Sequence, residues 1–319
     1  MLTALTGKVS SIKIFIKVHI VLINRANLLG QYEFKQRGKI MFKKNNHNNK
    51  FYYLGLTFLH SFLLFYVFYK KNNRREISLT FLSIIGLTFH FEYPLYILKA
   101  YKYKTKILKN KEQDNSFGSV LSQGLFVPTA AIFISTFNFG WSIKLLFSMY
   151  FALIERCFLK LNIYKNNWWR TTYTLILIFI YFFISDAWYN GIRNGNKLIL
   201  KLTLNNVFHV TYMNLLFLLS VFKKFKYQPV AFTTQPWYFH YSFVKIYIVV
   251  ETLITTYFLE QKKKWKRILP IIITLISDSF FKKINILKVN GSYWAYLFPA
   301  RIVPHLIAFL FKKWIKKYE

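Results

Sequence analysis

Long apolar segments alternate with short basic or Asn-rich segments along almost the whole chain after residue 50. A bilayer core of about 30 Å asks for roughly 20 apolar residues per helix, because in hydrocarbon every backbone N–H and C=O must be satisfied within the segment. Segments of this kind are Phe51–Tyr69, Leu79–Leu98, Gly118–Phe137, Trp141–Leu161, Thr171–Tyr189, Leu202–Phe222, Trp237–Leu259, Ile268–Ile286 and Tyr293–Phe311. The pattern predicts an all-α, polytopic helical membrane protein with about eight or nine transmembrane helices.

Aromatic residues at the segment ends support these boundaries, since amphipathic rings prefer the level of the lipid headgroups. Trp168, Trp237 and Trp294 are examples. Leu202–Phe222 is the most polar segment, because it contains three asparagines and a histidine. It is therefore either a ninth span or a re-entrant segment buried among its neighbours.

Orientation follows from one contrast, because nearly every loop is basic. The turn Asn138–Gly140 carries no charge, whereas the loops before and after it are rich in lysine and arginine. The positive-inside rule places that turn outside and the N-terminus in the cytoplasm. The same rule predicts that the basic loop Lys262–Arg267 is cytoplasmic, but nine simple spans would place this loop outside the cell.

The first forty residues differ from the rest. The apolar stretch Ile12–Asn24 is short and interrupted by Lys13, Lys17 and His19, and no cleavage site of small residues follows it. Codons allowed for Gln36–Met41 can form a ribosome-binding sequence just before Met41. We expect residues 1–40 to be a non-native or disordered extension, with an amphipathic helix on the membrane surface as the alternative, and residues 41–319 to form one transmembrane helical domain.

Composition first points to nucleic acid, because the 319 residues carry 45 Lys and Arg against 11 Asp and Glu, a net charge of +34. The charges nevertheless fall in short clusters between apolar runs, which is typical of membrane loops rather than of one basic face. We therefore expect anionic lipid headgroups as partners and no nucleic acid. The single cysteine, Cys157, excludes an intrachain disulfide.

Two stretches share an order of features, which indicates an internal repeat over 141–189 and 237–286. Glu155 precedes a basic loop with tryptophan and then Ile-Ser-Asp ending at Asp186, and Glu251 precedes a similar loop and then Ile-Ser-Asp ending at Asp278. Membrane proteins that move solutes often contain such repeats. The repeat is inverted if every segment crosses and parallel if one is re-entrant.

Ionisable side chains inside a membrane cost about 2.5 to 3.5 kcal/mol each, so they are retained where they are paired or used. Glu251 and Arg301 fall near the middle of their segments, and Arg301 shares a helical face with His305. We expect Glu251 and Arg301 to pair, as a structural link or, with Lys245 and His305, as the lining of a polar site. Weaker candidates are His90, Glu92, Glu155, Asp186 and Asp278, of which the last three lie toward segment ends and are expected to reach the headgroups.

No catalytic motif is recognisable. H-E-x-x-H, G-x-S-x-G, Walker A and G-x-G-x-x-G patterns are absent from the sequence. His90 and Glu92 are too few for a metal site, so no catalytic residue, metal or cofactor is expected. The main interpretation is a non-catalytic integral membrane protein with a structural, sensory or envelope role, and the alternative is a small-solute or ion transporter that uses the charges near Glu251 and Arg301. A third, a membrane-embedded enzyme, would require His90, Glu92 and Glu155 to come within hydrogen-bond distance of one another.

Four short motifs between Phe89 and Tyr189 carry a resemblance. They are Phe91–Tyr96, Ser122–Pro128, Ile154–Arg156 and Ile163–Arg170. This third of the chain resembles an uncharacterised multi-pass membrane protein family of Bacillus-like spore-forming bacteria. The resemblance implies a bacterial cell membrane as the location and implies no activity.

Overall fold

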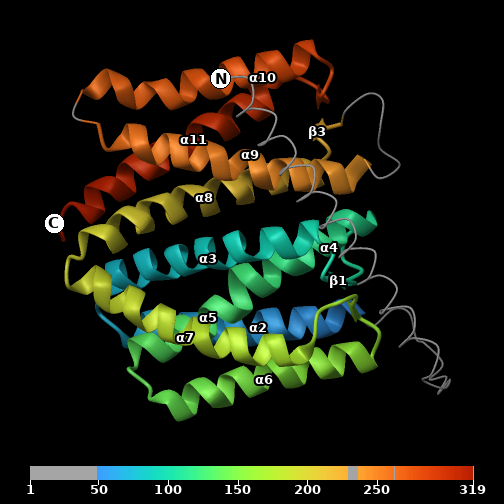
Figure 1. Cartoon of the computed structure of the whole chain (residues 1–319), viewed down its shortest axis with the longest axis vertical. Helices are drawn as coiled ribbons and strands as arrows, with labels where there is room; N and C mark the ends of the chain where they lie inside the picture. The colour runs from blue at the N-terminus through green and yellow to red at the C-terminus, as the bar shows by residue number, and fades with distance from the viewer. Residues whose placement is uncertain (1–48, 229–235, 262, 319) are drawn as a thin grey trace, which may run out of the picture.

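The computed structural model of the chain describes residues 49–228, 236–261 and 263–318, which fold into a bundle of long helices (Figure 1). The predicted extension 1–40 and the start at Met41 lie outside the described residues. The helices are α2 (Asn49–Lys70), α3 (Arg74–Ile97), α4 (Lys111–Leu121), α5 (Val127–Thr136), α6 (Trp141–Lys160), α7 (Thr171–Arg193), α8 (Lys197–Val221), α9 (Pro236–Leu259), α10 (Leu269–Lys283) and α11 (Tyr293–Ile315). Each of the predicted apolar segments lies on one of these helical passes.

Six of these helical passes are long and apolar enough to span a membrane. They are α2, the continuous stretch Lys111–Thr136, α7, α8, α9 and α11. The chain is thus an all-helical, membrane-embedded protein. The remaining passes are α3, which begins with three charged residues, the 20-residue α6 and the 15-residue α10. The predicted number of about eight or nine spans is therefore larger than the number of helices that meet these criteria.

Two segments with helix-breaking or polar residues differ in how regular their helices are. The stretch Lys111–Thr136 contains a π-helical turn, η1 (Ser122–Phe126), immediately before Pro128. Proline lacks a backbone N–H, and a π-turn accommodates the lost bond without ending the helix. The segment Leu202–Phe222, by contrast, lies on the unbroken 25-residue helix α8. The alternative of a re-entrant segment is wrong, because such a segment would have to break and return.

Short strands show that the bundle contains the same arrangement twice. After α3 comes β1 (Tyr101–Tyr103), which pairs antiparallel with β2 (Tyr164–Asn166) between α6 and α7. After α8 comes β3 (Phe225–Tyr227), which pairs antiparallel with β4 (Leu287–Val289) between α10 and α11. Both β1 and β3 lie at the same end of the bundle (Figure 1). The first half, 74–193, and the second half, 197–315, therefore match with α3 on α8, α6 on α10 and α7 on α11.

Backbone details repeat at the matching positions. Lys99 and Lys223 both adopt a positive φ, of 51° and 55°, where α3 and α8 end. Asn162 and Asn285 do so, at 56° and 59°, where α6 and α10 end. The hydrogen bond from the N–H of Lys104 to the carbonyl of Ile163 recurs from Gln228 to Ile286, at 3.0 and 2.8 Å. The correspondence therefore extends to individual residues.

This register corrects the expected repeat of 141–189 with 237–286. Glu155 precedes β2 by the same number of residues as Asp278 precedes β4, so Asp278, and not Glu251, occupies the position of Glu155. Because α3 and α8 both end at the strand-bearing side, the two halves run in the same direction (Figure 1).

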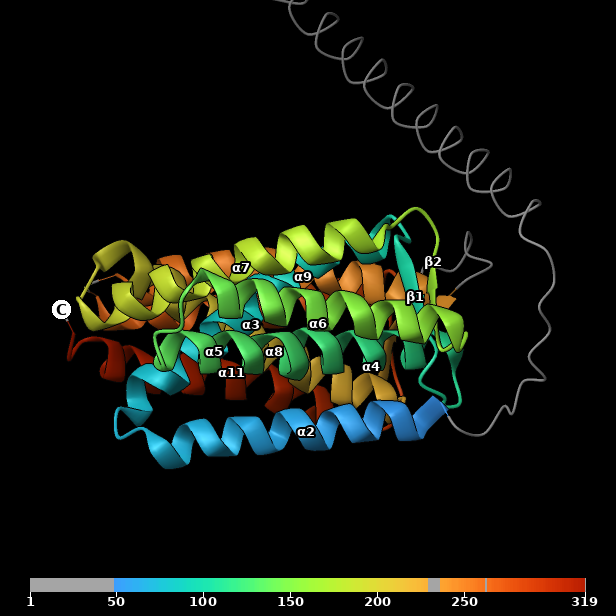
Figure 2. The same cartoon turned by 90° about the horizontal axis from the view of Figure 1, so that it is seen from below.

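The halves meet where α3 packs along α8 in the middle of the bundle (Figure 1). Gly86 of α3 allows this approach, since a Cβ there would lie 2.6 Å from the Cβ of Asn206. The additional helix α2 lies along the outside of the first half (Figure 2). Phe58 and Phe65 on its outer face are 76% and 67% exposed, as expected for a surface in contact with lipid.

Candidate functional site

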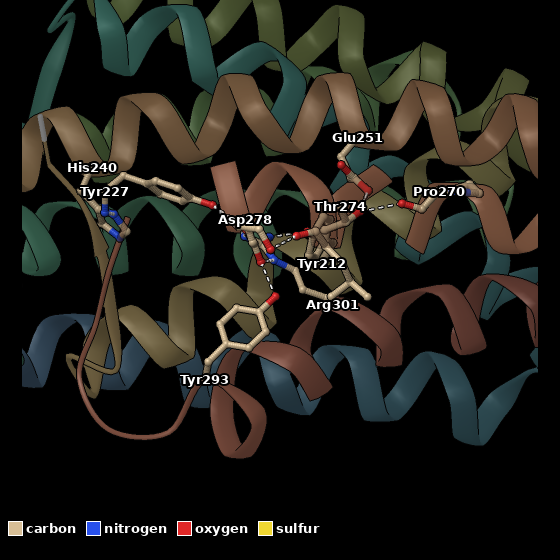
Figure 3. Close-up of polar contacts among 11 residues, drawn as sticks. Tyr212, Tyr227, His240, Glu251, Pro270, Thr274, Asp278, Tyr293 and Arg301 are labelled. Carbon is tan, nitrogen blue, oxygen red and sulfur yellow. Dashed lines mark hydrogen bonds and ion pairs between the residues drawn. The ribbon is translucent and has the colours of Figure 1, made fainter. Parts of the chain in front are cut away.

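Arg301 forms the most extensively bonded polar cluster in the second half (Figure 3). Its side chain, on α11, is fully buried. It forms a bidentate ion pair with Asp278 of α10, with an Nε–Oδ2 distance of 2.9 Å and an Nη2–Oδ1 distance of 2.7 Å. Nη2 also donates to the phenol of Tyr227 at 2.7 Å, and Nη1 donates to the phenol of Tyr212. Paired, fully hydrogen-bonded charges are the form in which an arginine can be buried.

The rest of this cluster completes the bonding of the carboxylate. Tyr293 donates to Asp278 at 2.8 Å and Tyr227 donates to it at 3.3 Å. Burial raises the pKa of the Tyr227 phenol, so the phenol keeps the proton that it donates. The rings of Tyr212 and Tyr247 flank the guanidinium at 5.4 and 5.1 Å, within the range of cation–π attraction. We define the Arg301 cluster as Tyr212, Tyr227, Tyr247, Asp278, Tyr293 and Arg301.

Arg301 pairs with Asp278, so the expected ion pair with Glu251 is wrong. Glu251 accepts a hydrogen bond from Thr274 instead, and Figure 3 shows that contact beside the Arg301 cluster. Asp278 is 1% exposed and does not reach the headgroups, contrary to the expectation from its place near a segment end. A neighbouring helix supplies a partner at that depth, which position along a single segment cannot reveal.

His305 and Lys245 are separated by the packing of the bundle. His305 donates through Nδ1 to the carbonyl of Arg301 at 2.7 Å, and its Nε2 lies 3.3 Å from the hydroxyl of Thr255. Lys245 instead lies over the ring of Tyr96, 3.1 Å from its centroid. The hydroxyl of Tyr96 in turn donates to Glu112 of α4 at 3.5 Å. Lys245 therefore belongs to a group on α3, α4 and α9, apart from the Arg301 cluster.

Glu92 and His90 take part in different contacts, although they are neighbours in the sequence. Glu92 is 2% exposed and accepts hydrogen bonds from Tyr101 and, at 2.9 Å, from Ser119. The ring of His90 lies 4.1 Å from that of His209 on α8. Within the described ranges, no three metal-ligating side chains come together.

Asp186 pairs with a lysine of the neighbouring helix. Its carboxylate lies 2.7 Å from the Nζ of Lys144 on α6 and accepts a hydrogen bond from Ser135 at 2.7 Å. The side chain is one-quarter exposed, so this pair joins α6 to α7 near the bundle surface.

Glu155 lines a cavity in the first half. The cavity has a volume of about 380 Å³ and lies among α2, α3, η1, α6 and α7. The carboxylate is 8% exposed and accepts hydrogen bonds from Asn166 and Thr171, each at 2.9 Å, and from Thr174. Among the residues that the structure describes, no Lys, Arg or His lies within ion-pair distance of Glu155. We call this cavity, with Glu155, the Glu155 chamber.

The Glu155 chamber and the Arg301 cluster occupy matching places in the two halves. By the register of the strands and helix ends, Glu155 matches Asp278 and Tyr103 matches Tyr227. Two of the differences are that Thr88 stands at the position of Tyr212 and that, counted from β2 and β4, Ile178 stands at the position of Arg301. Counted from the first residues of α7 and α11, the match to Arg301 is the residue after Ile178, which is also uncharged. Four of the first-half residues, Thr88, Tyr103, Glu155 and Ile178, line the chamber. The space that is open in the first half is thus occupied by side chains in the second half.

Comparisons with protein-family models, with curated proteins and with solved structures give no match to this chain. The resemblance to the family of spore-forming bacteria therefore stays a prediction.

Proposed function

We propose that the protein is a non-catalytic integral membrane protein of the cell membrane that binds a small solute in the Glu155 chamber, a sensory rather than a transporting role. One observation carries this proposal, namely that one half encloses about 380 Å³ where the other half is filled by Arg301. Cavities of about 300 to 1,000 Å³ with mostly apolar walls and a few polar groups are typical of ligand sites.

The Arg301 cluster fits a structural role better than the alternative of anion transport near Glu251 and Arg301. All the contacts of the guanidinium are made within the protein, by one carboxylate and two phenols. An incoming anion would have to break these bonds, and the displaced Asp278 would be left as a buried, unpaired charge. The second half therefore serves as the rigid counterpart of the ligand-binding first half.

Solvent access to a cysteine in the chamber tests the proposed binding site. In a Cys157→Ser background, Ser122→Cys places a thiol on the chamber lining. Ser148→Cys is the matched control, because Ser148 is fully buried in the same half and does not line the chamber. Methyl methanethiosulfonate should modify the first variant fully and leave the second unmodified, as read by intact-protein mass spectrometry. Adding Thr88→Tyr, which copies the second half, should protect the Ser122→Cys thiol.

Equal modification of the two thiols, or a lack of protection by Thr88→Tyr, would contradict an accessible chamber at this place. The reagent is small and uncharged, so this test does not depend on the chemical class of the ligand.

For the topology, we propose that α3, α6 and α10 also cross the membrane, which gives nine spans with the N-terminus in the cytoplasm. The support is that α3 and α8 run in the same direction, as they must when the four intervening loops alternate between the two sides. The strands β1 to β4 then lie on the cytoplasmic side, where their lysines meet anionic headgroups.

Labelling of single cysteines in intact cells distinguishes these sides. A membrane-impermeant maleimide should label Gly140→Cys and Lys263→Cys, which lie at the end without strands, and should not label Lys109→Cys or Lys165→Cys. All four positions are exposed. Protection of Lys263→Cys alone would mean that the positive-inside rule prevails at this loop and that one segment does not cross.

A further inference from the structure

The Arg301 cluster shows which chemical group fits the matching place in the first half. In the second half a guanidinium lies against a carboxylate, a phenol from the first strand of the half and aromatic rings. The first half keeps the carboxylate as Glu155 and the phenol as Tyr103. It has no cation at the matching position of α7, where Ile178 stands when the count starts from β2 and β4. Among the described residues, the carboxylate that the second half neutralises with Arg301 is thus retained in the first half without an ion-pair partner.

The walls of the chamber also suit a cation. Tyr103, Tyr164 and Trp169 are aromatic residues that line it together with Glu155. Such rings attract ammonium and guanidinium groups, most strongly where water is excluded. The remaining walls are mainly aliphatic and aromatic side chains, so the cation would need an apolar body.

Some residues of the chamber lining are also exposed on the outside of the bundle, and they indicate how such a molecule enters. Phe91 on α3 and Leu177, Ile180 and Ile184 on α7 border the chamber and are also exposed on the outside of the bundle, by 36% to 47%. In the proposed topology, where α3 and α7 cross the membrane, this outer surface faces the apolar interior of the bilayer. An amphiphilic cation that partitions into the membrane can therefore approach the chamber from the side.

We propose that the Glu155 chamber binds a monovalent organic cation, an ammonium or guanidinium group on an apolar body, with its charge on Glu155 in the place that Arg301 holds in the second half. The proposal rests on the proposed function, since it names the class of solute. Mg²⁺ or Ca²⁺ fits poorly, because each requires about six or more oxygen ligands and the chamber offers a single carboxylate that already accepts three hydrogen bonds.

Binding of three probes that share a benzyl group and differ in the charge of their polar group tests the ligand class. The purified full chain in dodecyl maltoside is titrated calorimetrically with benzylguanidinium, benzyl alcohol and phenylacetate. Benzylguanidinium should bind at least about tenfold more tightly than benzyl alcohol, and phenylacetate should not bind. Glu155→Gln should weaken the cation by about tenfold or more and leave benzyl alcohol unchanged. Glu260→Gln is the control, because this carboxylate pairs with Lys201 on the surface.

The outcomes separate the two proposals. Equal affinity for benzylguanidinium and benzyl alcohol, or no effect of Glu155→Gln, would contradict the proposal that the ligand is a cation. The proposal that the chamber binds a small solute would then still stand. Failure of all three probes together with an unreactive Ser122→Cys thiol overturns the chamber itself. If phosphatidylethanolamine added to the micelles competes with benzylguanidinium, the source of the ammonium group is a lipid, and the proposed chemistry stands.

A substitution that copies the second half gives an independent test. Ile178→Arg should supply the missing internal cation, raise the melting temperature and abolish binding of benzylguanidinium. The rise should disappear when Glu155→Gln is added. Ile178→Met, which changes the volume little and adds no charge, should retain binding. A folded Ile178→Arg variant that binds the probe like the unmodified chain would overturn the proposal, and if this variant does not fold, the Glu155→Gln titration decides.

Discussion

Replacing Arg301 with methionine is expected to lower the free energy of unfolding by about 3–5 kcal/mol, the usual cost of removing one partner of a buried ion pair. Asp278 would remain 1% exposed without a counter-ion, and Tyr212 and Tyr227 would each lose a hydrogen bond. The measurement is thermal or denaturant unfolding of the purified protein in detergent, together with its abundance in the membrane.

Arg193→Met is the matched control, because Arg193 is an exposed arginine at the end of α7. It should change stability by less than about 0.5 kcal/mol. Arg301→Met combined with Asp278→Leu should recover part of the loss, since an apolar pair of similar size leaves no buried charge. An Arg301→Met variant as stable as Arg193→Met would show that the cluster does not hold α8, α10 and α11 together.

Gly86→Ala is expected to lower the free energy of unfolding by about 1–3 kcal/mol through overpacking. The added Cβ would lie 2.6 Å from the Cβ and 2.9 Å from the Cα of Asn206, so the backbones of α3 and α8 would have to separate. Because α3 and α8 join the two halves, the loss should appear as a lower unfolding temperature of the whole bundle.

Gly55→Ala provides the comparison within the same chain. Gly55 lies inside α2 and has nothing within 4 Å of an added Cβ. This change should be neutral or stabilising by up to about 1 kcal/mol, because alanine favours a helix over glycine. Equal melting temperatures for the two alanine variants would contradict the close packing of the halves.

The helices could be predicted because a membrane imposes a single strong rule. An apolar run of sufficient length must satisfy its own backbone, so Phe51–Tyr69 or Tyr293–Phe311 can be placed from hydropathy alone. The partner of Arg301 could not be predicted in this way. Glu251 and Asp278 lie on different helices, and the choice between them depends on the rotation and packing of α9, α10 and α11, which a single sequence does not contain.

The register of the internal repeat is visible in the sequence as pairs of similar strings, whereas the acidic residues indicate a different register. Lys99–Tyr103 reads Lys-Ala-Tyr-Lys-Tyr and Lys223–Tyr227 reads Lys-Lys-Phe-Lys-Tyr. Leu161–Lys165 and Ile284–Lys288 are likewise similar. These strings form β1 to β4 and their preceding turns. The lysines in these strings also fit loops that set the topology. The two Ile-Ser-Asp sequences predict a different register, in which Glu251 takes the place that Asp278 occupies.

The environment of Glu155 differs most from the expectation. Its place near the end of α6 predicted a carboxylate that reaches the headgroups, but a strand, a loop and two threonines enclose it at 8% exposure. Asp278 is enclosed at the matching position. Around this carboxylate, the first half thus has Thr88 in place of Tyr212 and an uncharged residue of α7 in place of Arg301, among other changes.

The most direct test of this account is an experimental structure of the full chain with benzylguanidinium bound. The account predicts density for the guanidinium within hydrogen-bond distance of the Glu155 carboxylate, with its aromatic ring toward Tyr181 and Ile184, and an unchanged Arg301 cluster. Density for the probe at any other place, with the Glu155 chamber filled by protein side chains, would contradict it.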